Sequence, residues 1–157
     1  MDVVFRTDSS HNIGTGHVMR CLSLADATRR NDTNISFVCR EGPGNLISYI
    51  ENRGYEVHLL PGEIDIEKDR RLTKNILSKN EIKPDWLIID HYDIGIQWES
   101  AMYGLVNKIM VIDDLANRKH VCDLLLDQNY SKNEDRYSGL VSGNCIKLLG
   151  PKYSILR

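Results

Sequence analysis

The chain has 157 residues, of which 41% are hydrophobic and 27% are charged, and these values predict one globular domain with a hydrophobic core of its own. Its 20 basic and 22 acidic residues give a formal net charge of -2, which argues against nucleic acid or an anionic membrane as the partner. The opening residues MDVVFRTDSS contain no long apolar stretch, so we expect neither a signal peptide nor a spanning helix, and a cytoplasmic location.

Short apolar runs alternate along the chain with stretches in which apolar residues recur every three or four positions. This alternation predicts strands and helices in turn, and therefore an α/β fold of three layers with a parallel sheet between helices, of the Rossmann-like kind. In the first half we expect, in order, a strand at Val3–Phe5, a helix beginning near Gly14 with Val18, Cys21, Leu22 and Ala25 on one face, a strand at Ile35–Val38, a short helix opened by Pro43 and Gly44 and ended by Gly54, and a strand at Tyr55–Leu60.

The second half continues the same alternation. We expect, in order, a helix with Leu72, Ile76 and Leu77 on one face, a central strand at Trp86–Ile89, a helix with Trp98, Ala101, Met102 and Leu105 on one face, and strands at Ile109–Ile112, Leu124–Leu126 and Ile146–Leu149. Residues 68–74 contain four basic residues interrupted by Asp69, and we interpret them as a solvated helix face without a function.

The four cysteines lie far apart in the sequence, at positions 21, 39, 122 and 145. None belongs to a CxxC motif or to a Cys/His pair with the spacing of metal ligands. We therefore predict reduced structural thiols, no metal site and no cofactor.

Polar residues follow three of the predicted strands. In an open parallel sheet the ligand crevice lies beyond the carboxyl ends of the strands, so these residues are the candidates for ligand contact. The candidate substrate-binding residues are Arg6, Asp8, Ser9, Gly14, Thr15 and Gly16 after the first strand, Asp90, His91 and Tyr92 after the central strand, and Asp113 and Asp114 after the next. For the last pair an N-cap of a following helix is an equally good interpretation.

The glycines at positions 14 and 16 stand between a strand and a helix, but they do not make a dinucleotide fingerprint. The third glycine of GxGxxG would fall on Met19, and the loop from Thr7 to Ile13 separates the strand from the glycines. What the two glycines permit is a close approach of a ligand to bare backbone amides at a helix start, where negative charge is favoured.

His17 follows these glycines and is the candidate catalytic residue. The field of a helix N-terminus disfavours an imidazolium, so the ring is expected to stay neutral near pH 7 and to act as a general base. We expect Asp8 to orient the ring; the alternative is a histidine that only bonds to its own loop. Since Ser9 and Ser10 lack a nucleophile-elbow context, we predict direct attack by water.

Four segments carry a resemblance that these patterns do not supply. The segments FRTDSSHNIGTGHVMRCLSLA, LIIDHYDI, VIDDLANRKHVCDLLLDQN and LLGPKYSILR, in this order, resemble the UDP-sugar hydrolases of the pseudaminic acid pathway. A looser resemblance extends to polysaccharide-biosynthesis proteins related to spore-coat synthesis and to glycosyltransferases of the same architecture.

The resemblance implies the N-terminal half of a glycosyltransferase-B-like fold. It implies hydrolysis of UDP-2,4-diacetamido-2,4,6-trideoxy-β-L-altropyranose to UDP and free sugar without a metal, with the family's catalytic histidine on His17. It also implies that residues 1–157 form a single domain whose nucleotide-binding partner domain is expected downstream, in cis or in a split partner. The isolated chain is then expected to be incomplete and only weakly active.

Two other functions remain open from the sequence. The first is a glycosyltransferase in which His17 deprotonates an acceptor hydroxyl group instead of water. The second is a binding module without catalytic activity.

Overall fold

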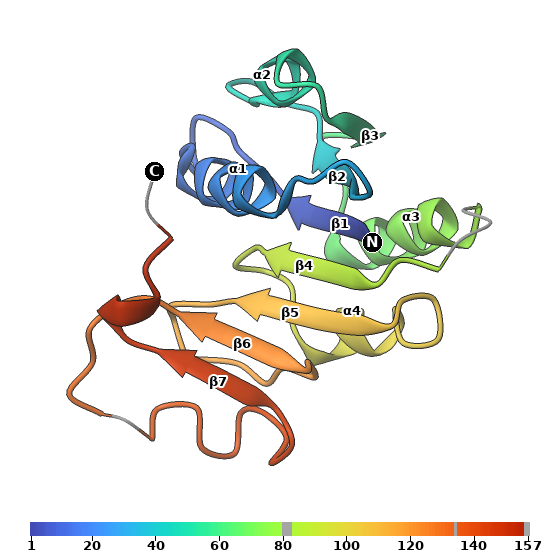
Figure 1. The fold of residues 1–157 in the computed structure, drawn as a ribbon. Coiled ribbons are helices and arrows are strands. Elements are labelled where there is room, and N and C mark those ends of the chain that lie inside the picture. Colours follow the sequence, from blue (N-terminus) through green and yellow to red (C-terminus); the bar gives the residue numbers. More distant parts are fainter. Residues whose placement is uncertain (80–82, 134, 156–157) are drawn as a thin grey trace.

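A computed structural model describes residues 1–79, 83–133 and 135–155 of the chain. The order of elements is shown in Figure 1. In chain order they are β1 (Asp2–Thr7), α1 (Gly16–Thr28), β2 (Asn34–Arg40), α2 (Ile47–Asn52), β3 (Glu56–Leu60), α3 (Ile66–Lys79), β4 (Trp86–Asp90), α4 (Ile96–Ser100), β5 (Lys108–Ile112), β6 (Leu124–Asp127), β7 (Ile146–Leu149) and a short 3-10 helix at Pro151–Tyr153.

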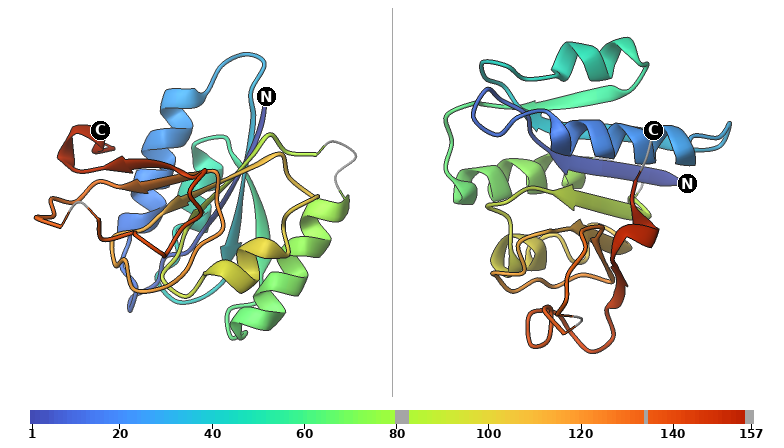
Figure 2. Two further views of the ribbon diagram at one scale, coloured as in Figure 1. Left: turned by 90° about the horizontal axis from the view of Figure 1, so that it is seen from below. Right: turned by 90° about the vertical axis from the view of Figure 1, so that its left-hand side faces the viewer.

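The strands form one 7-stranded sheet in the order β3-β2-β1-β4-β5-β6-β7, and every neighbouring pair is parallel. Helices α1 and α3 lie on opposite faces of this sheet, and α4 lies on the same face as α3 (Figure 2). The prediction of a Rossmann-like, three-layer parallel α/β fold is confirmed. The arrangement is consistent with the N-terminal half of a glycosyltransferase-B-like fold.

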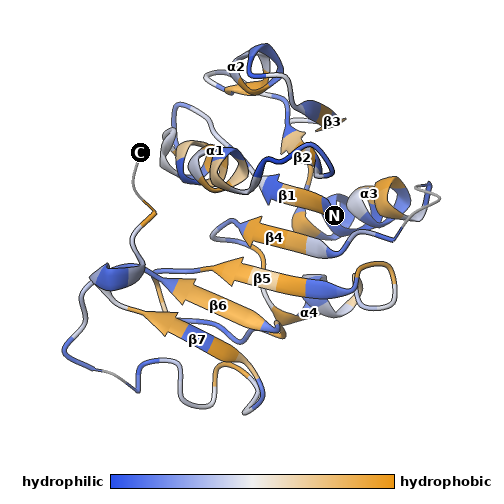
Figure 3. Ribbon diagram, in the orientation of Figure 1, coloured by the Kyte–Doolittle hydropathy of each residue, from blue (hydrophilic) through white to orange (hydrophobic). Residues whose placement is uncertain are grey.

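The two faces of the sheet follow from the alternation of side chains along each strand. In β1, Val3 and Phe5 pack with α1, whereas Val4 points to the opposite face and joins the cluster beneath α3 and α4. Strands β4, β5 and β6 are hydrophobic over most of their length (Figure 3), as expected for strands that are covered on both faces.

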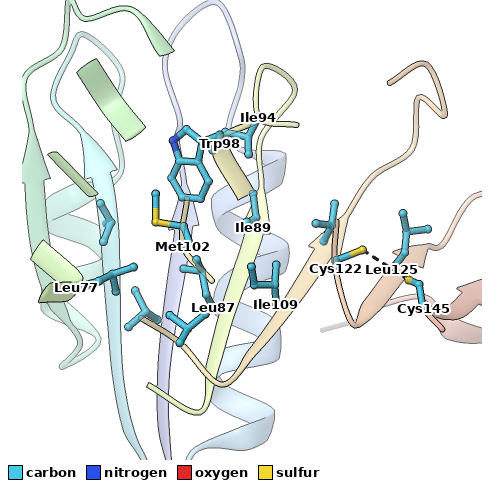
Figure 4. Packing of buried hydrophobic residues seen from close by; sticks show 14 of the residues in the cluster. Leu77, Leu87, Ile89, Ile94, Trp98, Met102, Ile109, Cys122, Leu125 and Cys145 are labelled. Carbon is cyan, nitrogen blue, oxygen red and sulfur yellow. Dashed lines mark hydrogen bonds between the residues drawn. The ribbon is translucent and has the colours of Figure 1, made fainter. Parts of the chain in front are cut away.

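The larger core cluster lies between the central strands and helices α3 and α4. Leu87, Ile89 and Ile109 from the strands meet Trp98 and Met102 there, and all five side chains are buried (Figure 4). Burial of each such side chain contributes roughly 1.5–3 kcal/mol relative to exposure. This cluster therefore anchors the strand ends that precede the loops after β4 and β5.

Three predicted boundaries were wrong. Helix α4 ends at Ser100 and does not reach Leu105, because the chain tightens into short turns and Gly104 adopts a positive φ of 89°. Strand β1 runs to Thr7, because it pairs on both sides with β2 and β4. Helix α2 begins only at Ile47, after a turn at residues 43 and 44.

All four cysteines are buried and free, in agreement with the prediction of reduced structural thiols. Cys122 and Cys145, 23 residues apart in the chain, bring their sulfur atoms to 3.6 Å of each other (Figure 4). Within the described residues, no helix combines the length and the apolar character needed to cross a bilayer.

The strand order places a crevice at a defined point of the sheet. From β1 the chain proceeds outward through β2 and β3, and it then returns to place β4 on the other side of β1. The loops that leave the carboxyl ends of β1 and β4 therefore diverge to opposite sides, which is where open parallel sheets bind their ligands.

Candidate functional site

His17 and Asp90 meet at this divergence between β1 and β4. Asp90 is the last residue of β4 and pairs in register with Thr7 at the end of β1, while His17 is the second residue of α1. The Nδ1 atom of His17 lies 2.5 Å from Oδ1 of Asp90, and the Asp90 side chain is fully buried. The sheet and the helix start thus hold an imidazole against a carboxylate at the ligand-binding edge.

This contact assigns the two ring nitrogens of His17 different roles. A carboxylate can only accept, so Nδ1 carries the hydrogen and donates to Asp90, which leaves the lone pair on Nε2. The residue is only 6% exposed, but Nε2 makes no hydrogen bond within the described residues and is not among their buried unpartnered polar atoms. Nε2 therefore reaches solvent and has the form of a general base.

Arg20 holds the same carboxylate from one helical turn further along α1. Its Nε donates to Oδ2 of Asp90 at 2.5 Å, and its Nη2 donates to Oδ1 at 2.7 Å. Burial alone would raise the pKa of Asp90, but the hydrogen bonds from Arg20 and His17 and their charges lower it below its ordinary value. Asp90 is therefore a fixed, ionised acceptor for the His17 ring.

Tyr92 and Asp114 border the same group on its open side. The Tyr92 ring is 42% exposed and meets the His17 ring edge-on, with 4.5 Å between ring centroids. Asp114 places Oδ2 3.7 Å from Nη1 of Arg20, while its Oδ1 is buried without a partner in the described part of the chain. Burial, with the charge of Asp114, raises the pKa of Tyr92. Both side chains line the approach to His17.

The start of α1 is open. Thr15 is the N-cap residue but its side chain caps no amide, and a Cβ atom placed on Gly16 would meet nothing within 4 Å. A cavity of about 540 Å³ lies beside this helix start, lined by Thr15, Gly16, Met19, Leu46 and Tyr49. Free backbone amides at a helix N-terminus favour a negatively charged group in such a place.

Asp8 does not orient His17, contrary to the prediction. Its carboxylate instead receives two hydrogen bonds from the Arg6 guanidinium, at 2.6 and 2.9 Å, and one from His91 Nε2 at 2.9 Å. Burial would raise the pKa of Asp8, but Arg6 and His91 hold it well below its usual range. Asp90 takes the orienting role because β4 is the strand next to β1 at this point.

Arg6 and His91, predicted to contact substrate, belong to this buried network instead. Arg6 is 0% exposed and bridges Asp8 and Asp69, which also accepts from Trp98 Nε1. Nδ1 of His91 accepts from the Asp93 amide, so its Nε2 hydrogen is committed to Asp8. The network ties the ends of β1 and β4 to α3 and keeps both residues away from the crevice.

Two more candidates are occupied by structural hydrogen bonds. Ser9 is buried and its hydroxyl oxygen accepts from the Leu46 amide at 2.9 Å. Asp113 is buried and accepts from the Ala116 amide, from Arg118 and from Tyr137. The described residues contain no helix directly after it, so it stabilises a turn and is not a helix N-cap.

The sequence analysis missed Arg20 and Asp69. Arg20 stands three residues after His17, which places both on one helix face, and this spacing was the available signal. Asp69 lies on the same stripe of α3 as Thr73 and Leu77, at intervals of four residues, and is fully buried, so it is not part of a solvated face. Its position on the apolar stripe could have revealed it.

A second buried His–carboxylate pair was also missed. His120 Nδ1 lies 2.6 Å from Glu99 Oε1, and both side chains are almost completely buried. Glu99 follows Trp98 in the short helix α4, and no local pattern pairs it with position 120. Among the described residues, no group of three or more His, Cys, Asp or Glu side chains is arranged to hold a metal ion.

Comparison with known proteins finds two similar chains, and no family model matches. The chain is 37% identical, over its whole length, to 52% of the UDP-2,4-diacetamido-2,4,6-trideoxy-β-L-altropyranose hydrolase of Campylobacter jejuni. It is 31% identical, again over its whole length, to 31% of an uncharacterized protein of Methanocaldococcus jannaschii. The chain thus spans about half the length of one curated relative and a third of the other, and it is similar to a part of a UDP-sugar hydrolase.

Proposed function

We propose that this chain supplies the general base of a UDP-sugar hydrolase that releases UDP and a free diacetamido-trideoxy sugar in pseudaminic acid biosynthesis. The observation that carries the proposal is the His17–Asp90 pair at the diverging ends of β1 and β4, with Nε2 of His17 free. The similarity to the Campylobacter jejuni hydrolase over the whole chain supports the reaction class and the sugar.

In the proposed reaction, a water molecule attacks the anomeric carbon while Nε2 of His17 removes one of its protons. The bond between the anomeric carbon and the UDP oxygen breaks, UDP leaves with the electron pair, and the new hydroxyl remains on the sugar. The imidazolium that forms is stabilised by the Asp90 carboxylate, which already holds Nδ1–H. This proton transfer is worth roughly 10²–10⁴ in rate.

Substrate binding is proposed for the residues that remain accessible around His17. Tyr92 and Asp114 border the imidazole, and Gly14, Thr15 and Gly16 present an uncapped helix start. The helix start suits negative charge on the departing diphosphate or on a sugar carbonyl oxygen. Most of the uridine and diphosphate contacts are proposed to come from a second, nucleotide-binding domain, in cis or in a split partner.

The deciding experiment is incubation of the complete enzyme, with its nucleotide-binding domain, with the UDP-sugar alone. Release of free sugar and UDP in equal amounts without an acceptor supports hydrolysis, and undiminished activity in EDTA supports a metal-independent reaction. Turnover only when an acceptor sugar is added would assign His17 to a glycosyltransferase. Binding of the UDP-sugar without any turnover would indicate a binding module.

A further inference from the structure

The Asp90 carboxylate is shared by two partners on one face of α1. Arg20 donates to both of its oxygens, at 2.5 and 2.7 Å, and His17 Nδ1 uses one of the same oxygens at 2.5 Å. Nη2 of Arg20 lies only 3.3 Å from Nδ1 of His17. A two-pronged guanidinium and an imidazole thus compete for a single buried negative charge.

The charges of this group balance only when His17 is neutral. Asp90 contributes one negative charge and Arg20 one positive charge, and both side chains are buried or nearly so. A proton on His17 would place a second positive charge beside Arg20, at the N-terminal end of a 13-residue helix whose field also opposes it. Without Arg20, the same carboxylate would attract a proton onto the ring.

The other groups that face His17 do not replace this effect. Tyr92, from the loop after β4, meets the ring with its edge, and its raised pKa keeps it uncharged. Asp114, from the loop after β5, lies 3.7 Å from Arg20 and opposes it from the far side. The Cys21 thiol contacts Oδ2 of Asp90 at 3.8 Å, and burial raises its pKa well above the usual value.

We propose that Arg20 is a positioning residue: by clamping and neutralising Asp90, it keeps His17 uncharged at neutral pH while Asp90 still fixes the ring with Nε2 free. The inference rests on the proposed function in that it explains how His17 stays available as a base. Arg20 itself touches no reacting atom in this scheme.

The test is an NMR titration of the His17 ring in the native chain and in Arg20→Gln, with the signal assigned by its absence in His17→Ala. Loss of an opposing positive charge within a few ångströms is expected to move the pH of half-protonation upward by about one unit or more. Arg30→Gln is the matched control, because Arg30 is exposed just after the end of α1 and carries the same charge. It is expected to titrate as the native chain does.

Circular dichroism confirms that each variant is folded. If Arg20→Gln does not fold, Arg20→Lys decides the question: it keeps the charge but cannot donate in the same fork, so a smaller upward shift is expected. A folded variant that titrates at the native pH would overturn the inference. Because the titration uses no substrate, an upward shift in a protein that hydrolyses no nucleotide sugar upholds the role of Arg20 and counts against the proposed function alone.

In the complete enzyme, the acid limb of the pH profile of kcat/KM is expected to move upward by the same amount in Arg20→Gln. Activity at pH 7 should then fall about tenfold or more and recover at higher pH. A loss of activity that is equal at every pH would show that Arg20 is only structural.

Discussion

At the scale of single residues, the function proposed here depends on how one imidazole is held. His17 has Asp90 on one ring nitrogen, Tyr92 at its edge and a free Nε2. The sequence analysis identified His17 as the base, and this stays a prediction. The residue it selected as the orienting acid, Asp8, is wrong, since that carboxylate belongs to Arg6 and His91.

Replacing His17 by Ala in the complete enzyme is expected to lower kcat by about two to four orders of magnitude, because no other group would take the proton from water. Steady-state assays of UDP release measure this effect. Wild-type turnover in a correctly folded His17→Ala enzyme would remove the proposed role.

Replacing Asp90 by Asn tests the orienting role separately. We expect a smaller decrease in kcat than for His17→Ala, because the imidazole remains but the charge that stabilises its protonated form is lost. Asp8→Asn is the comparison variant, since Asp8 makes no contact with His17 among the described residues. An Asp8→Asn enzyme with the larger defect in kcat, at equal stability, would restore Asp8 to the site.

At the scale of secondary structure elements, the start of α1 and the loop before it serve different purposes. Gly16 has open space at the position of a Cβ atom, so the fold does not require glycine there. Gly44 has a positive φ of 79°, and a Cβ atom on it would lie 2.8 Å from the backbone nitrogen of His11. The first glycine keeps the helix start accessible, and the second lets two loops pack together.

This difference predicts opposite effects of two glycine-to-alanine substitutions. Gly16→Ala is expected to leave the free energy of unfolding unchanged or to raise it by up to about 1 kcal/mol, because alanine restricts the unfolded chain. Gly44→Ala is expected to lower it by about 1–3 kcal/mol, because its backbone conformation becomes strained. Urea unfolding of both variants measures the difference, and equal midpoints would contradict it.

At the scale of the whole molecule, buried ion pairs tie the strand ends together. Asp8, Asp69 and Asp90 all have a lowered pKa, because the charges and hydrogen bonds of Arg6, Arg20 and their neighbours outweigh the cost of burial. A lowered pKa in the folded state contributes stability that is fully present above the ordinary carboxyl value and is lost as the pH falls below it.

The free energy of unfolding is therefore expected to decrease steeply below about pH 4, the ordinary range of aspartate. From pH 5 to pH 8 these three carboxylates should contribute no change. Urea unfolding at a series of pH values measures the dependence. Undiminished stability at pH 3 would show that the three ion pairs do not stabilise the fold.

The proposed division between two domains also makes a prediction. The chain spans about half of the hydrolase to which it is similar, and we propose that the other domain provides most of the nucleotide contacts. Residues 1–157 alone are then expected to bind UDP with a Kd of about 1 mM, equivalent to only about 4 kcal/mol. Isothermal titration calorimetry checks this against the complete enzyme, and tight binding by the chain alone would contradict the division.

The sequence by itself determined the fold class and the place of the candidate base. The alternation of β-branched runs with helical spacing is a local property, and a parallel sheet between helices follows from it because both faces of such strands must be covered. The glycines before His17 likewise marked the start of α1. These features depend on residues that are close together in the chain.

Only the tertiary structure decided which polar side chains meet. Asp90 lies 73 residues from His17 and reaches it because β4, not β2, occupies the side of β1 where α1 begins. Arg6 and Asp69, 63 residues apart, are paired beneath the sheet edge in the same way. The order and register of strands depend on the packing of the whole core, so the partner of each carboxylate is fixed by non-local contacts that no sequence motif records.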